Sequence, residues 1–137
     1  MAIHWWPSPA AGEIVWCHFP QDKGLEPAPK PRPALIIKVF DDHAPQFYVS
    51  VAYGTSQKTH QLRVGEFLIA STETAAYRLA GSSYPTKFSF QHVVELPFND
   101  QWFKPPPHAP YGQIPKLGVL HPSLMRRAQA AWEAAQP

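Results

Sequence analysis

The stretch GEIVWCHF, residues 12–19, and the stretch RPALIIKVF, residues 32–40, decide the fold of this chain. Residues 12–19 alternate between two faces, which is typical of a β-strand. Residues 34–40 are apolar on both faces apart from Lys38, as expected of a buried central strand. The polar loop between the two stretches ends at Arg32 and Pro33. Arg32 is therefore expected at the mouth of a strand, where a rigid scaffold can hold its guanidinium group against a phosphate.

Further short β-type segments follow these two stretches. Residues 46–53 alternate again, and residues 66–70, 86–90 and 93–96 have strand composition. Many short strands with small connecting loops predict a mainly β fold, a small and curved barrel-like sheet. Its expected core contains Val15, Leu35, Ile37, Val49, Val51 and Ile69.

The end of the chain has a different pattern. Pro122 suits a first helical position, and an apolar stripe of Leu124, Ala128, Ala131 and Ala135 follows it. Residues 122–136 are thus predicted to form a C-terminal amphipathic α-helix on the sheet. The Pro-rich, aromatic residues 101–121 are interpreted as a long ordered excursion. The interpretation is one domain over residues 1–137, with the barrel at 12–100.

Composition sets limits on function. The 137 residues are 45% hydrophobic, which argues against global disorder. A net charge of +2 is too weak to indicate a nucleic-acid-binding protein, so any polyanion site must come from local clustering. The single Cys17 excludes an intramolecular disulfide. The N-terminus is unlike a signal peptide and no run approaches a membrane span, so we expect a soluble, cytoplasmic protein without membrane contact.

Two blocks together resemble a known family. The first is Gly12-Glu13-Ile14-Val15-Trp16 with the later R-P-A-L-I-I at 32–37, and the second is V-A-Y-G-T-S-Q at 51–57. Their order and spacing are similar to the PemK/MazF-like toxins of bacterial type II toxin–antitoxin systems, over about the first 60 residues. The resemblance implies an SH3-like β-barrel that forms a homodimer and pairs with an antitoxin protein.

The resemblance also implies an activity, the metal-independent cleavage of single-stranded RNA. In such toxins the Arg of the first block and the Thr of the second act in catalysis, which corresponds to Arg32 and Thr55 here. The ribose 2′-hydroxyl attacks the neighbouring phosphate and leaves a cyclic phosphate. For Arg32 we favour charge stabilisation over proton donation, because a guanidinium group has a very high pKa.

Other residues near the two blocks are candidates for RNA binding. Cationic side chains attract phosphates and aromatic rings stack on bases, although solubilising loop charge is an equally good interpretation. The candidates are Lys23, Lys30, Lys58, Lys87, Ser56, Gln57 and Trp16. The polar-aromatic block at 83–88 is a further candidate for lining the same cleft. The histidines are scattered, so we expect no metal site and no cofactor; His18 and His60 are weaker candidates for proton transfer.

A second hypothesis is a non-catalytic barrel that binds a protein or a nucleic acid. The Pro-rich segment, the modest charge and the lack of a carboxylate beside Lys87 and Ser89 favour it. The aromatic residues also exceed what a small barrel can hold. We expect Trp5, Trp6, Trp102, Phe103 and Trp132 to cover either a partner or another part of the chain.

Overall fold

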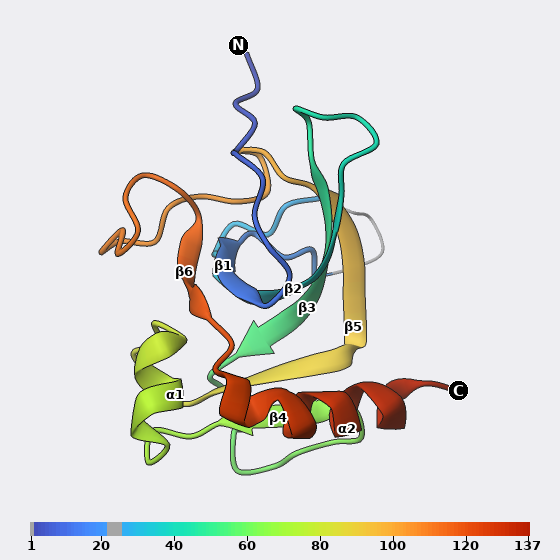
Figure 1. The fold of residues 1–137 in the computed structure, drawn as a ribbon, viewed down its shortest axis with the longest axis vertical. Helices are drawn as coiled ribbons and strands as arrows, with labels where there is room; N and C mark the ends of the chain where they lie inside the picture. Colours follow the sequence, from blue (N-terminus) through green and yellow to red (C-terminus); the bar gives the residue numbers. More distant parts are fainter. Residues whose placement is uncertain (1, 22–25) are drawn as a thin grey trace.

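The computed structural model describes residues 2–21 and 26–137. Within them, antiparallel strands form a curled half-barrel, and helices lie against one part of it (Figure 1). The elements are β1 Glu13–Cys17, β2 Arg32–Phe40, β3 Tyr48–Thr55, β4 Glu66–Ile69, α1 Thr74–Leu79, β5 Thr86–Pro97, β6 Lys116–Val119, a 3₁₀ turn Pro122–Leu124 and α2 Met125–Ala135. The predicted mainly β, barrel-like fold with a C-terminal helix is confirmed.

The sheet has the strand order β4-β5-β3-β2-β1-β6, which places the two short strands β4 and β6 at its edges. Pairing of β2 with both β1 and β3 makes β2 a central strand, as its sequence predicts. Strand β5 pairs with β3 along nearly its whole length and with β4 over residues 86–89, and it bends sharply along its course (Figure 1). The bend curls the sheet.

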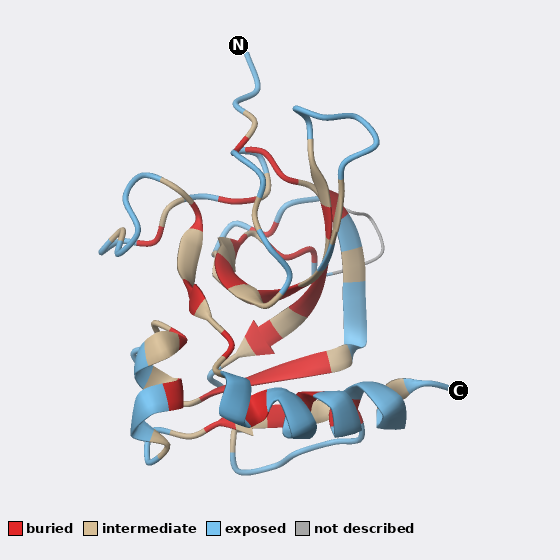
Figure 2. Cartoon of the chain, viewed as in Figure 1, coloured by how far each residue is buried: buried red, intermediate tan, exposed pale blue. Residues whose placement is uncertain are grey.

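Apolar side chains pack on both faces of the sheet. Successive residues of β1, Ile14 and Val15, enter different clusters, as the two-residue period of a strand requires. The first cluster includes Leu124 of the C-terminal region, and the second includes Phe103 of the β5–β6 connection. Figure 2 shows the buried residues concentrated in the strands and on the inner side of α2.

The expected core is largely confirmed, and so is the helix stripe. Of the predicted core residues, Ile37 alone is half-buried, and it packs against the first cluster. Leu124 at the end of the 3₁₀ turn and Ala128 and Ala131 of α2 are buried, whereas Ala135 at the end of α2 is half-buried. Neither helix of the described residues has the length and hydropathy needed to cross a membrane.

The excess aromatic residues pack mainly within the chain. The Trp6 indole Nε1 donates a hydrogen bond of 3.0 Å to the Phe103 carbonyl, and both residues are buried. The Trp5 ring lies 5.7 Å from that of Tyr48, and the Trp132 ring lies 5.4 Å from that of Phe90. These contacts show one of the two predicted roles, in which the aromatic residues cover another part of the same chain.

Three elements differ from the expected pattern. Residues 86–90 and 93–96 form one strand, β5, interrupted by a bulge: Tyr53 pairs with Ser89 while the preceding Ala52 pairs with Val93. The helix α1 lies between β4 and β5, and β6 arises inside the Pro-rich segment 101–121. Strand β6 is four residues long and pairs with β1, about a hundred residues earlier, so no local pattern indicates it.

Candidate active site

A pocket of about 440 Å³ lies where β2 begins and β3 ends. Its size falls in the range of sites that hold small molecules or parts of larger ones. Segments far apart in the sequence form its walls: Trp16, residues 30–33, 55–57 and 81–84, Thr86, residues 106–108, Pro110 and Leu117. Arg32 and Thr55 are both among them, so the structure brings the two candidate catalytic residues to one cavity.

Arg32 is the first residue of β2 and pairs with Cys17 of β1. Because Pro33 follows it, its backbone is restricted to extended conformations, which suits a strand start. The side chain is half-buried, and its Nε atom is buried without a hydrogen-bond partner among the described residues. A buried guanidinium N–H without a partner is costly, whereas the guanidinium group as a whole is suited to bind an anion in the pocket that Arg32 lines.

Thr55 is the last residue of β3. Ala34 of β2 faces Tyr53, and the same register continued by two residues puts Arg32 across from Thr55. The Thr55 Oγ1 accepts a 3.0 Å hydrogen bond from the Gln57 amide, which leaves the hydroxyl hydrogen for donation to a ligand. Gly54 permits this approach, because a Cβ atom there would lie 2.4 Å from the Pro33 carbonyl oxygen.

The candidate RNA-binding residues divide into two groups. Trp16, Lys30, Ser56 and Gln57 line the pocket with Arg32 and Thr55. Lys58 and Lys87 do not line it, and Lys23 lies outside the described residues.

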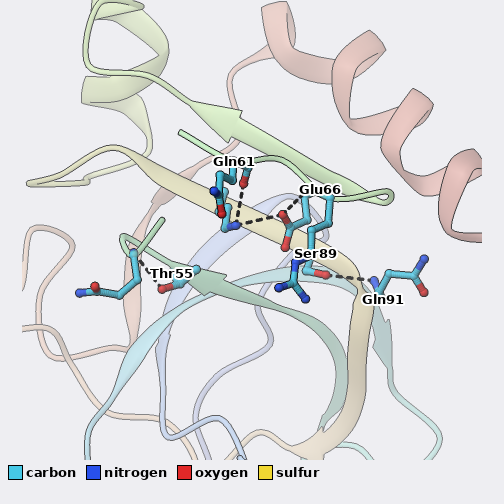
Figure 3. A network of polar contacts seen from close by, with 8 residues as sticks. Thr55, Gln61, Glu66, Ser89 and Gln91 are labelled. Carbon is cyan, nitrogen blue, oxygen red and sulfur yellow. Dashed lines mark hydrogen bonds and ion pairs between the residues drawn. The ribbon is translucent and has the colours of Figure 1, made fainter. Parts of the chain in front are cut away.

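Lys87 is buried beneath the loop that follows Thr55. Its ammonium donates to Glu66 Oε1 at 3.0 Å and to the Gln61 carbonyl at 2.9 Å, next to β3 (Figure 3). Burial raises the pKa of the Glu66 carboxyl, but hydrogen bonds from the Arg63 amide and from Lys87 outweigh it and lower that pKa overall. Lys87 therefore ties the loop 56–65 to β5. The carboxylate that Lys87 lacks among its sequence neighbours is supplied by Glu66, 21 residues earlier in the chain.

The opposite wall comes from two connections. Gly81 and Gly118 bring the α1–β5 connection close to β6: a Cβ atom on Gly118 would lie 2.3 Å from the Ala80 carbonyl group. Ser83, Tyr84 and Thr86 of the polar-aromatic block do line the pocket, as that block's composition suggested. The β5–β6 connection adds prolines and His108, which sequence reasoning missed because only the tertiary fold returns this segment to Arg32.

The other titratable residues considered from sequence lie elsewhere. His18 has its Nδ1 atom 2.7 Å from the Ala28 carbonyl oxygen, and His60 is exposed outside the pocket. Cys17 is fully buried, which raises the pKa of its thiol and makes it a poor nucleophile. Among the described residues, no three His, Cys, Asp or Glu side chains gather as metal ligands.

The lining residues give the pocket a defined chemistry. Lys30 and Arg32 supply two cations, and the described lining contains no carboxylate. Hydroxyl groups and apolar surfaces, including the Trp16 and Tyr84 rings, complete it. Such a site suits an anion that carries a flat apolar group, as a nucleotide does.

Comparison with known proteins finds a family whose match includes the strand residues of this pocket. Curated proteins give no match to the chain. A family described as the PemK-like, MazF-like toxins of type II toxin–antitoxin systems matches residues 10–96, which include Trp16, Arg32 and Thr55. The match covers more than half of the 137 residues, and the chain belongs to this family of toxins.

Proposed function

We propose that the protein is a metal-independent endoribonuclease that cleaves single-stranded RNA in the pocket where β2 begins and β3 ends. The observation that carries this proposal is the presence of Arg32 and Thr55 in one cavity, whose described lining has two cations and no carboxylate. Family membership supports it, because the match covers both residues.

In the proposed reaction the ribose 2′-oxygen attacks the adjacent phosphorus and the bond to the 5′-oxygen breaks. The products are a 2′,3′-cyclic phosphate and a 5′-hydroxyl. Arg32 stabilises the negative charge that develops on the phosphorane oxygens, and Thr55 donates a hydrogen bond to the same group. Arg32 remains protonated throughout, since a guanidinium group is not deprotonated in proteins.

The remaining lining residues position the RNA. Lys30 attracts the backbone, Ser56 and Gln57 offer hydrogen bonds, and the Trp16 ring provides a stacking surface for a base. We further propose a homodimer, an antitoxin partner and a cytoplasmic location, on family grounds. Of the aromatic residues considered for an interface, Trp6 and Phe103 are buried within the chain, whereas Trp132 is exposed and remains a candidate for one.

One observation favours the alternative, a barrel that binds RNA or protein without cutting. Lys87 is engaged by Glu66 and Gln61 and does not line the pocket, and the described lining residues within 10–96 include no histidine or carboxylate that could accept a proton.

A cleavage assay separates the two functions. We expect the wild-type protein to cut single-stranded RNA in the presence of EDTA. The Arg32→Ala variant should lose about 10²–10³ in rate, as expected on removal of one charge-stabilising donor. Arg32→Lys should recover little, because a point charge does not replace the planar fork. Equal cleavage by wild type and Arg32→Ala contradicts the proposed site, and RNA binding without cleavage supports the alternative.

A further inference from the structure

The β5–β6 connection forms a closed loop against the pocket. Its two ends bind the same residue: the Lys104 amide donates to the Trp16 carbonyl at 3.2 Å, and the Trp16 amide donates to the Pro115 carbonyl at 2.9 Å. Trp16 itself lines the pocket. A loop whose ends close on one pocket residue is held in a fixed position relative to the pocket.

The tip of this loop is also constrained. The Ala109 amide donates to the Pro106 carbonyl at 2.9 Å, and Ala109 has a positive φ of 39°. Prolines on both sides restrict the backbone further. This turn presents His108 to the cavity that Arg32 and Thr55 line. The segment lies beyond residues 10–96, the part of the chain that the family match covers.

The proposed reaction needs a group that accepts the 2′-hydroxyl proton. Among the described lining residues, the ionisable side chains are Lys30, Arg32, Tyr84 and His108. Amines, guanidinium groups and phenols ordinarily titrate at about pH 10 or above, so they are protonated at neutral pH. Pocket residues from β1, β3 and β6 do not ionise in this range. An imidazole is the one lining group of a type that accepts protons near neutral pH.

We propose that His108 is the general base of RNA cleavage in this protein, an inference that rests on the proposed function. The neutral imidazole accepts the 2′-hydroxyl proton as the bond between the 2′-oxygen and phosphorus forms. The bond between phosphorus and the 5′-oxygen breaks, and the 5′-oxygen takes a proton from solvent. The imidazolium then returns its proton to solvent, so no net proton is gained or lost.

The test is the pH dependence of kcat/KM for an RNA oligonucleotide. Wild-type kcat/KM should rise with unit slope through the acidic range and level off near neutral pH. His108→Ala should lower kcat/KM at neutral pH by about 10²–10⁴ and lose the rise through the range in which imidazoles titrate. Added imidazole should restore part of the rate. His60→Ala, an exposed histidine outside the pocket, is the matched control and should behave as wild type.

A second readout separates proton transfer from binding. A 2′-O-methyl oligonucleotide cannot be cleaved, and its Kd should be the same for wild type and His108→Gln. A weaker Kd with an unchanged kcat makes His108 a binding residue and overturns the inference. If the wild type is active and His108→Ala is equally active with the same pH profile, the inference about His108 is overturned, but the nuclease function stands. An inactive wild type overturns both.

Discussion

The pocket has two walls of different construction. One wall consists of residues at strand ends, Arg32 and Thr55, which backbone register places across from each other. The other wall consists of two connections, residues 81–84 and 106–110. Close backbone approach at Gly81 and Gly118 holds the first, and hydrogen bonds to Trp16 hold the second. Strand register depends on a pattern that sequence displays directly, whereas the position of a connection depends on packing between distant residues. The strand-built wall could therefore be predicted from the sequence, whereas the connection-built wall could not.

The first prediction tests the buried ion pair that anchors the loop after Thr55. Lys87 and Glu66 have side chains only 8% and 11% exposed, so removing one partner leaves a shielded charge. We expect Lys87→Met to lower the free energy of unfolding by about 3–5 kcal/mol, and Lys87→Met with Glu66→Gln to regain much of it. Denaturant unfolding of wild type and both variants measures this. If Lys87→Met alone is as stable as wild type, the ion pair does not anchor the loop.

The same pair predicts a direction for acid denaturation. The pKa of Glu66 is lower in the folded protein than in an unfolded chain, so the unfolded state binds the proton more readily. The resulting stability is present above about pH 4.3, the usual value of an unfolded Glu, and is lost as pH falls through the lower folded value. The double variant should therefore show a shallower fall in stability below about pH 4 than wild type does.

The second prediction concerns the strand-built wall. Thr55→Ala removes a hydrogen bond to a charged group in the transition state, a loss of about 1.5–3 kcal/mol, or roughly tenfold to a hundredfold in rate. Thr55→Ser keeps the hydroxyl and should be mild. The cleavage rates are to be compared with unfolding midpoints of the same variants. A rate loss that follows the midpoint would show a structural role for Thr55 rather than a chemical one.

The third prediction concerns the connection-built wall. In Gly118→Ala the added Cβ meets the Ala80 backbone, which cannot move aside as a flexible side chain can. Overpacking of this kind should cost about 1–3 kcal/mol of stability. Gln113→Ala, an exposed position in the same part of the chain, serves as the control and should stay within about 0.5 kcal/mol of wild type. Thermal unfolding distinguishes them, and equal stability would mean that the close contact is not maintained in solution.

The smallest effect is expected at the surface pair of Arg127 and Glu73. Arg127 donates to both carboxylate oxygens, at 2.8 and 2.9 Å, which lowers the pKa of Glu73 and raises that of Arg127. Both side chains are substantially exposed, so Glu73→Gln should cost about 0.2–1 kcal/mol. Its destabilisation should also shrink in high salt. A cost as large as that of Lys87→Met would remove the distinction between the buried and the exposed pair.

Much of the fold followed from sequence because its signals are local. The two-residue alternation identified β1 and β3, and the uninterrupted apolar run identified β2 as central. The four-residue β6 carries no such signal and exists only through pairing with β1. For β5, two separate strands were predicted at 86–90 and 93–96, whereas the structure has one strand with a bulge between them.

The candidate site, like the fold, could be predicted only where its residues lie in local sequence patterns. Arg32 and Thr55 were identified because each ends or begins a strand within a motif, and the structure places both in one pocket. Lys87 was identified by charge alone, and charge does not reveal that a side chain is buried against Glu66. His108 was missed because its position depends on the contacts of Trp16 with residues 104 and 115. Those contacts join residues about ninety or more positions apart.

The most direct test of the central claim is an analysis of the ends that the wild-type protein leaves on RNA. A single-stranded oligonucleotide is incubated in EDTA, beside the same oligonucleotide with one 2′-deoxy residue at the cleaved position. Attack by the 2′-hydroxyl predicts a 2′,3′-cyclic phosphate and a 5′-hydroxyl on the first RNA, and no cleavage of the second at that position. A 5′-phosphate product, or unchanged cleavage at the 2′-deoxy residue, would contradict the account.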